Sequence, residues 1–422
     1  MRRRILWLLL ALPALFILAA FAYNLPPINH RVSVQVAELR SRLKYALSPP
    51  DEAVFVPQSG GGQGAEPTLP PPAFTRIAPT RLPNSTEPAQ AESTPETPIS
   101  PATATPRALP GSIPERVELE GVVYVDQHNR WNYCGPANLA MALNFWGWSG
   151  TRDDVARVVK PGVQDPSLDF IQQGRWDKNV MPYEMADFVN EHTEFNALTR
   201  YGGDLEVLKS LIAAGFPVVV EKGYSEADYT GRVAWLGHYL FTTGYDETRG
   251  EFTVQDAYLE PGRDMHVDYQ TYLDGWRSFD YLFMVIYPPE REGEVMERLG
   301  PWADPAWANQ HAVEIAQAET ETLNGIDEFF AWFNLGTSHV QLQNYGEAAQ
   351  AFDEAFRVYA EIEDENTQRP YRIMWYQTGP YWAYYYSGRY QDVIDLANTT
   401  LYDTISEPTL EESIYWRALA YL

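Results

Sequence analysis

The chain has 422 residues, of which 45% are hydrophobic, enough for two or three domains with cores of their own. Its formal net charge of −26 at pH 7 argues against a nucleic-acid-binding protein, because phosphate contacts need a basic surface. The single cysteine cannot form an internal disulfide, so cysteine usage does not indicate a cellular compartment.

The N-terminus predicts a membrane anchor. Residues 5–22 carry no charge and are long enough to cross a bilayer as a helix. Three arginines precede this run and the next basic residue is Arg31, which predicts that the remainder lies outside the cytoplasm. The Ala-Phe-Ala sequence at 20–22 also resembles a signal-peptide cleavage site, which would give a secreted protein. We expect residues 1–23 to be an uncleaved signal anchor, and both alternatives export the rest of the chain.

Two segments follow before the first globular domain. Residues 24–56 are interpreted as a juxtamembrane segment, in which Val36, Leu39, Leu43 and Leu47 follow a helical period; an irregular stalk fits as well. Residues 57–112 are rich in Pro, Ser, Thr, Ala and Gly and cannot bury enough apolar surface to offset the entropy of ordering. We predict a disordered linker that lifts the next domain off the membrane.

Residues 113–290 have the patterns of an α+β domain. Helical periodicity is found first and strand-like patterns mostly follow, which favours an α+β fold over a wound βαβ sheet. The expected helices are 135–147, 181–193 and 204–215, and the expected strands are 117–127, 216–224, 238–245, 251–257 and 281–289.

Residues 300–422 are helical and aromatic in pattern. Trp332, Leu335, Gly336 and Tyr345 are spaced as in the tetratricopeptide repeat, a helix–turn–helix unit of about 34 residues. A second turn at Tyr390 follows after 45 residues, which requires an insertion or a divergent unit. We predict tetratricopeptide-like repeats, with a generic helical bundle as the alternative.

Cys134 stands before Gly135-Pro136 at the start of an apolar helical run. A thiol attacks as the thiolate, which a nearby imidazole and a helix N-terminus both favour. Cys134 is therefore a candidate nucleophile, although a cysteine is also a common small core residue.

The partner imidazole comes from one of seven histidines, and His238 is placed best. It opens a predicted strand that a short turn connects to a second strand, as in an antiparallel hairpin. With the turn centred near residues 247–248, Asp256 falls opposite His238 on the same face. A carboxylate beside an imidazole fixes its tautomer and orientation. The other histidines are His30, His128, His192, His266, His311 and His339.

Acyl transfer also needs donors for the developing oxyanion. The backbone N–H of Cys134 is one candidate. Gln127 lies seven residues upstream and supplies a side-chain amide, with Asn129 and Asn132 as alternatives.

Three sequence blocks carry a family resemblance. They are Gln127 with the run from Cys134 to Gly147, the stretch from Gly237 to Asp246, and the stretch from Phe252 to Tyr258. In this order they resemble the C39-like cysteine peptidases, the double-glycine or bacteriocin-processing type, over roughly residues 118–288. The resemblance implies a papain-like fold.

The resemblance also implies residue roles. Cys134 would be the nucleophile, His238 the general base and acid, and Asp256 the orienting carboxylate, while Gln127 would help form the oxyanion hole. The chain departs from the family pattern at Ala257, where a proline often follows the aspartate, and in the Gln-to-Cys spacing of seven rather than six. The chain contains no ABC transporter region, so export-coupled leader cleavage does not carry over.

The sequence therefore predicts a membrane-anchored, extracytoplasmic cysteine peptidase that acts on a peptide or protein. Its repeats would bind a partner or present substrate. The alternatives are a non-catalytic papain-like binding or scaffold protein, and an acyltransferase or transpeptidase with the same triad. No cofactor, metal or nucleic acid is expected, because zinc-site and nucleotide-binding motifs are missing from the sequence.

Overall fold

The computed structural model describes residues 26–58, 113–130, 132–163, 165, 168, 173–174, 179–227, 233–362, 369–405 and 409–422, with side chains from residue 32 onward. The predicted anchor and all but the ends of the predicted linker lie outside these residues. Within the part of the chain described, none of the helices combines the length and apolar character that a bilayer crossing needs.

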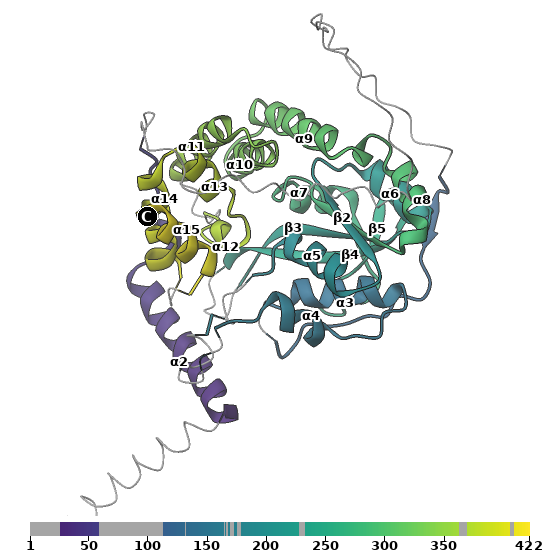
Figure 1. Ribbon diagram of the computed structural model, residues 1–422, viewed down its shortest axis with the longest axis horizontal. Coiled ribbons are helices and arrows are strands. Elements are labelled where there is room, and N and C mark those ends of the chain that lie inside the picture. Colours follow the sequence, from purple (N-terminus) through teal and green to yellow (C-terminus); the bar gives the residue numbers. More distant parts are fainter. Residues whose placement is uncertain are drawn as a thin grey trace, which may run out of the picture.

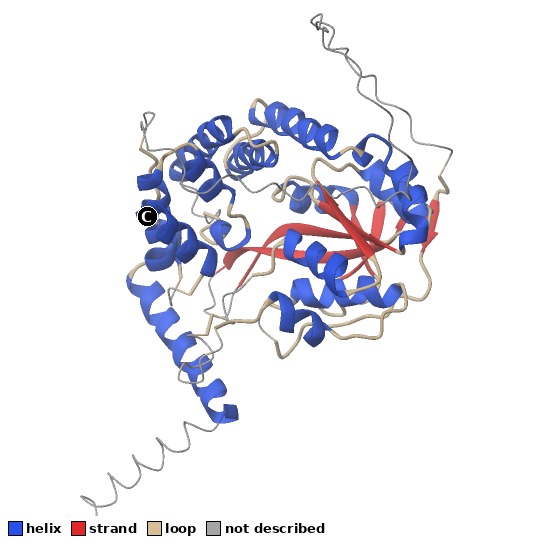
Figure 2. Cartoon of the chain, viewed as in Figure 1, coloured by secondary structure: helices blue, strands red, loops and turns tan. Residues whose placement is uncertain are grey.

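A seven-stranded antiparallel sheet forms the centre of the first domain (Figures 1 and 2). Six strands follow the order β2-β7-β3-β4-β5-β6, and β1 pairs with β4. The strands are β1 (Arg116–Glu118), β2 (Asn196–Arg200), β3 (Val218–Ala227), β4 (Val233–Asp246), β5 (Glu251–Gln255), β6 (Met265–Asp268) and β7 (Phe283–Tyr287). The long neighbours β3 and β4 bring residues from opposite ends of the domain together.

Helices cover both faces of this sheet. Alternate residues of β3 enter different cores, Val219 on one side and Val218 and Val220 on the other, as the two-residue period of a strand requires. Val219 contacts the core beneath α3 (Cys134–Phe145), α4 (Arg152–Val159) and α5 (Pro182–His192). The opposite face packs against α6 (Leu205–Ala213), α7 (Tyr269–Arg277) and α8 (Glu292–Leu299). The expected α+β fold is confirmed.

The run from Cys134 to Leu143 forms the central helix because nearly every side chain finds an apolar partner. All ten of these residues are buried. Residues such as Ala and Leu have high helix propensity, and burial on all sides suits a helix that is apolar all round. The helix ends before Gly147, whose φ of +94° suits glycine.

One predicted strand is wrong in extent. Residues 117–127 were expected to be a strand, but β1 ends at Glu118. The chain then turns at Gly121, whose φ is +85°, and runs as irregular backbone across the end of α3. Val122, Tyr124 and Val125 pack against the core around α3, so their apolar pattern reflects tertiary contact rather than strand pairing.

The C-terminal region is all helical. It contains α9 (Pro305–Thr320), α10 (Ile326–Gln341), α11 (Tyr345–Glu361), α12 (Ile373–Tyr376), α13 (Gly379–Tyr386), α14 (Tyr390–Asn398), a π-helix η4 (Thr399–Thr404) and α15 (Glu411–Tyr421). Helices α10 with α11 and α13 with α14 form two pairs, and α12 lies between the pairs. The stretch between α11 and α13, which contains α12, accommodates the extra residues between the two turns, while the assignment to tetratricopeptide repeats stays a prediction.

The segment before the predicted linker packs on this C-terminal region (Figure 1). It forms α2 (Pro26–Leu47) and a short 3-10 helix η1 (Pro50–Glu52). Tyr45 is buried and its hydroxyl donates to Thr404 O at 2.9 Å. Phe55 packs against Phe356 with ring centroids 5.0 Å apart, and Gln58 N donates to Asp392 Oδ1 at 2.8 Å. Residues 32–58 thus pack on the helical body, a contact that the sequence did not predict, while α2 agrees with the helical alternative for this segment.

Candidate active site

Cys134 is the first residue of α3 and is buried. The first N–H groups of a helix have no acceptor within it, and the helix dipole favours negative charge at this end. Gly135 makes the position possible: a Cβ there would lie 3.1 Å from Val180 Cβ and 3.3 Å from Met185 Sδ. Glycine at position 135 therefore allows the start of α3, which carries the thiol, to pack closely against Val180 and Met185.

His238 and Asp256 meet in the interior of the domain. His238 lies in β4, and Asp256 is the first residue after β5. The imidazole Nε2 lies 2.8 Å from Asp256 Oδ1, and both residues are buried. The same Oδ1 accepts from the backbone N–H groups of Tyr258 and Leu259 at 2.8 and 2.9 Å. Three donors thus hold this carboxylate and, through it, the ring.

The Cys134 thiol lies within interaction range of His238, and the imidazole and the backbone of Tyr239 both act to lower the pKa of the thiol. Since Nε2 faces Asp256, Nδ1 is the nitrogen that meets the thiol. The structure therefore brings Cys134, His238 and Asp256 together in one chain of contacts.

The electrostatics of this group favour charge separation. Burial raises the pKa of the Cys134 thiol, but the hydrogen bond and charge of His238 outweigh it and leave the pKa below the ordinary value. Burial lowers the pKa of His238, but the charge and hydrogen bond of Asp256 outweigh it and raise that pKa to about 10. Burial also raises the pKa of Asp256, and the imidazolium reverses that effect, so the carboxyl stays ionised. The two shifts act in opposite directions and favour transfer of the thiol proton to the imidazole.

Lys160 adds a second positive charge. It follows α4, is buried, and donates from Nζ to the backbone oxygen of Asn132 at 3.0 Å. Its charge contributes to lowering the pKa of Cys134. Sequence reasoning missed this lysine, because a single Lys at a helix end normally faces solvent.

The backbone of Gln127 contacts the residue that follows Asp256. Its N–H donates to Ala257 O at 2.7 Å, next to Asp256 in the chain. Its Oε1 is buried and has no hydrogen-bond partner in the described part of the chain. This oxygen is an acceptor, so it does not test the predicted donation from the Gln127 amide to an oxyanion. The alternatives differ: Asn129 is exposed, and the backbone oxygen of Asn132 is engaged by Lys160.

The rival histidines lie away from the thiol contact. His128 is the nearest, and Tyr258 lies between it and His238, with ring centroids 6.3 and 6.2 Å away. The His128 side chain is partly exposed and lies 3.5 Å from Asp126. His266 lies 3.2 Å from Glu251 on β5.

The helical region reaches the site through Tyr376, the last residue of α12. Its ring packs against Trp235 with centroids 5.6 Å apart, and it also lies beside Gly237, the residue before His238. A Cβ on Gly237 would lie 2.7 Å from Tyr376 Cδ1, so only glycine allows this approach. Tyr224 packs edge-on against His238 at 5.8 Å. Tyr224 and Tyr258 thus flank the imidazole, and Tyr376 of the helical region reaches the neighbouring Gly237.

A buried carboxyl lies close to the same group. Glu221 on β3 pairs with Tyr239 on β4 and is hydrogen-bonded to its side chain. Burial raises the pKa of Glu221 well above its ordinary value, and the charge of the Cys134 thiolate adds to the shift. Burial thus favours the protonated form of Glu221.

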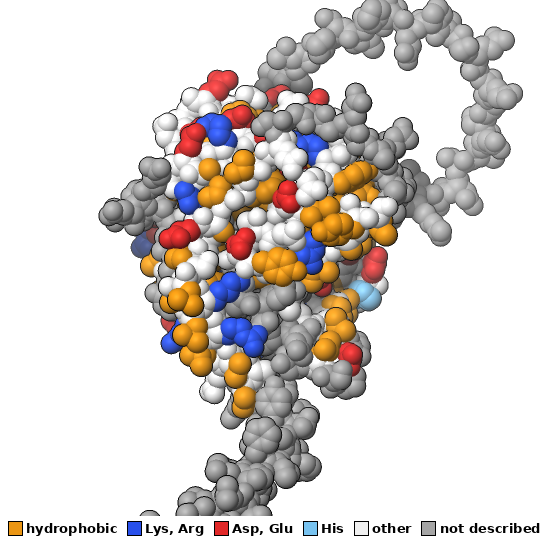
Figure 3. Space-filling view, turned by 90° about the vertical axis from the view of Figure 1, so that its left-hand side faces the viewer, with side chains coloured by type: hydrophobic (Ala, Val, Ile, Leu, Met, Phe, Trp, Pro, Cys, Tyr) orange, Lys and Arg blue, Asp and Glu red, His pale blue; other side chains and the backbone are white. Residues whose placement is uncertain are grey.

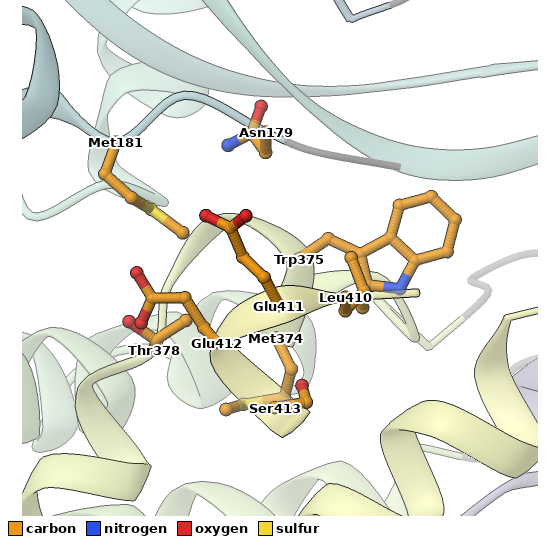
Figure 4. Close-up of a pocket in the computed structure, with 9 residues that line it drawn as sticks. All are labelled: Asn179, Met181, Met374, Trp375, Thr378, Leu410, Glu411, Glu412 and Ser413. Atoms are coloured by element: carbon orange, nitrogen blue, oxygen red, sulfur yellow. The ribbon is translucent and has the colours of Figure 1, made fainter. Parts of the chain in front are cut away.

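A hollow lies where the two regions meet (Figure 4). Asn179 Nδ2 and Trp375 Nε1 are buried there and have no hydrogen-bond partner among the described residues. Val180, which contacts Gly135, is the chain neighbour of Asn179; Tyr376 is the neighbour of Trp375. The lining residues are Asn179, Met181, Met374, Trp375, Thr378, Leu410, Glu411, Glu412 and Ser413.

Comparison with known families decides what this domain is. A family model described as "Peptidase_C39 like family" matches residues 119–283, which include Cys134, His238 and Asp256. Residues 119–283 form a C39-like domain. The predicted family resemblance is confirmed for this region, and with it a papain-like α+β fold. None of the curated proteins compared with the chain matches it.

Several solved structures are similar to the C39-like domain. A C39-like peptidase from Bacillus anthracis is 18% identical, with a TM-score of 0.32, and the match covers 41% of this chain and 98% of the other. The peptidase domain of Streptococcus ComA, a bifunctional ABC transporter, is 13% identical with a TM-score of 0.28, covering 39% and 99%. Xylellain, a cysteine protease from Xylella fastidiosa, is 20% identical with a TM-score of 0.27, covering 42% and 87%.

Metal chemistry has no site in the described residues, because no three His, Cys, Asp or Glu side chains there are grouped as ligands.

Proposed function

We propose that the chain is a cysteine peptidase that cleaves peptide bonds with Cys134, His238 and Asp256. The observation that supports this most is the unbroken chain of contacts from thiol to imidazole to carboxylate, with His238 Nε2 2.8 Å from Asp256 Oδ1. The pKa of the Cys134 thiol is lowered and that of His238 is raised, and this combination favours a reactive thiolate.

The proposed reaction proceeds in two steps. His238 Nδ1 takes the thiol proton, and the thiolate attacks the peptide carbonyl to form a C–S bond. The N–H of Cys134 and the Gln127 carboxamide donate to the oxyanion. His238 then gives its proton to the leaving amine as the C–N bond breaks. In the second step a water molecule loses a proton to His238, attacks the thioester and releases the carboxylic acid and the thiol.

The helical region contributes to substrate binding in this proposal. The hollow in Figure 4 has two buried donors, Asn179 Nδ2 and Trp375 Nε1, that have no partner among the residues the structure describes. Carbonyl oxygens of a bound peptide would accept from them, which would satisfy both groups. The rest of the chain would be held at a membrane by residues 5–22, with the catalytic domain outside the cytoplasm.

Cleavage of a mixture of defined peptides tests the proposal. The full chain is incubated with the mixture, and new N-termini are identified by mass spectrometry. We expect cleavage by the wild type and none by Cys134→Ala. Ser210→Ala, which removes a buried hydroxyl on α6 instead, is the matched control and retains cleavage.

Three results would overturn the proposal. Cleavage that persists in Cys134→Ala rules out the thiol as nucleophile. No cleavage by the wild type, together with transfer of a peptide acyl group to an added amine, indicates the acyltransferase alternative instead. Absence of both activities would leave the domain as a binding module.

A further inference from the structure

Helix α2 presents a row of large aliphatic side chains to solvent. Val36, Leu39, Leu43 and Leu47 are 48%, 59%, 59% and 88% exposed. They are spaced by three or four residues, so they lie along one face of the helix. We call these four residues the apolar stripe of α2. An exposed apolar patch of this kind marks an interaction surface.

The opposite face of α2 fixes the direction of this stripe. Val34, Ala37, Ser41 and Tyr45 are buried against the helical region. The Tyr45 hydroxyl donates to Thr404 O, and Lys44 Nζ donates to the backbone oxygens of η4 and of the residue after it. Because one face is held in this way, the apolar stripe must face outward from the body.

Basic residues accompany the stripe. Arg40, Arg42 and Lys44 lie on α2, while Glu38 is the one acidic residue among the side chains described there. This is a local excess of positive charge in a chain whose net charge is −26. Figure 3, which faces this side of the molecule, shows hydrophobic side chains with Lys and Arg among them over the lower surface. An exposed apolar row with basic residues is typical of a helix that lies in a membrane interface.

The sequence before α2 identifies what covers the stripe. The uncharged run of residues 5–22 ends four positions before Pro26, where α2 begins. Four peptide units reach at most about 14 Å. If residues 5–22 cross the bilayer, α2 must begin within or close to the headgroup layer. The short connection to residues 5–22 would bring a membrane to this face, but it would not bring a second copy of the chain or a partner protein there.

We propose that α2 lies along the membrane surface, with the apolar stripe in the headgroup and upper acyl layer and the exposed Arg40 and Arg42 near anionic lipid headgroups. This rests on the proposed membrane anchor. Since α2 also holds η4 and the helical region, the catalytic body is held at the membrane surface. That arrangement differs from a body lifted away on the linker.

Depth-dependent quenching tests the proposal on the full chain. The chain, in a Cys134→Ala background, is reconstituted in liposomes of phosphatidylcholine with phosphatidylglycerol. A fluorophore is attached to Leu43→Cys in the stripe or to Ile414→Cys on α15, which is exposed apolar helix in the same body. We expect brominated lipids to quench the label at 43 and to leave the label at 414 unchanged. Iodide in the aqueous phase should do the reverse.

Flotation of the same samples through a density gradient shows whether the chain binds the liposomes at all. It therefore tests the membrane anchor independently of the position of the stripe. If the chain does not float with the liposomes, the anchor itself fails and the proposal falls with it. If it floats but iodide, not brominated lipid, quenches at 43, the anchor stands and the stripe proposal is wrong. A pyrene label at 43 that gives excimer emission would assign the stripe to a second copy, and would also overturn the proposal.

Discussion

The two regions of this molecule are built around different interiors. The C39-like domain buries polar and charged groups next to its sheet, among them His238, Asp256 and Glu221. The helical region buries aromatic rings, with Phe333 and Phe352 only 4.9 Å apart at their centroids. Buried polar groups are costly unless they are paired, whereas aromatic burial stabilises directly. Substitutions should therefore alter chemistry in the first region and stability in the second.

Replacing the imidazole should give the largest effect on activity. His238→Gln keeps an amide near Asp256 but cannot exchange a proton with the thiol. We expect kcat/KM for a cleaved peptide to fall by about 10²–10⁴-fold, the usual contribution of a general base. His266→Gln on β6 is the matched control and should stay near the wild-type value. Equal losses in both variants would contradict the assignment of His238.

The largest effect on stability should come from the aromatic core. Phe352 is fully buried on α11, and a Cβ on Gly336 would lie 2.7 Å from its ring. Phe352→Ala leaves a cavity and should lower the free energy of unfolding by about 3–5 kcal/mol. Urea unfolding measures the change, with the exposed Tyr415→Ala as control. A change below that of Tyr415→Ala would mean that this core does not carry the region's stability.

Asp256→Asn should alter the pH dependence of cleavage. The charge of Asp256 raises the pKa of His238, so removing it lowers that pKa. The imidazolium is then lost at a lower pH, and the alkaline limb of kcat/KM should move down in pH. Asp274→Asn, on the surface of α7, serves as control. An alkaline limb that does not move would show that Asp256 has no electrostatic influence on the ring.

Trp375→Phe tests whether the helical region takes part in substrate binding. The substitution removes the indole N–H and keeps most of the ring. Loss of one hydrogen bond to bound peptide should raise KM by about 2–10-fold with kcat nearly unchanged. Trp307→Phe on α9 provides the same chemical change away from the site. If KM is the same in both variants, the hollow is not a substrate contact.

Glu221→Gln should have the smallest effect and should sharpen the contrast between the regions. Because burial raises the pKa of Glu221, the folded protein keeps its proton while the unfolded chain releases it. The wild type therefore loses stability relative to the variant as pH rises above the unfolded value of about 4.5. Thermal unfolding of both proteins at pH 5 and pH 8 should show a gap in Tm that widens with pH. A constant gap would mean that Glu221 is ionised when folded.

The sequence was informative where structure depends on neighbours in the chain. The apolar run after Cys134 and its glycine end predicted α3 from periodicity and capping. The short turn between residues 246 and 251 predicted the β4–β5 hairpin and set His238 near Asp256. The predicted regular pairing of the two strands did not include two features of the structure. The register contains a bulge between Thr242 and Gly244, and Asp256 lies just past the last paired residue of β5.

Contacts between residues that are far apart in the chain could not be predicted from local sequence patterns. Tyr376 approaches Gly237 across more than one hundred residues, and α2 packs on η4 across more than three hundred and fifty. Lys160 and Glu221 look like ordinary polar residues at the end of a helix and within a strand. Only the assembled fold buries them near Cys134, because the desolvation that shifts a pKa is a tertiary effect.

The central claim is that Cys134 is a thiolate held by His238. Alkylation of the full chain with iodoacetamide from pH 4 to 9, followed by intact mass, tests it directly because the chain has one thiol. We predict that labelling of the wild type persists well below pH 7. In His238→Gln we predict that it appears only near or above the ordinary thiol value of about 8.5. Identical curves near 8.5 for both proteins, or no labelling of the folded wild type, would contradict the account.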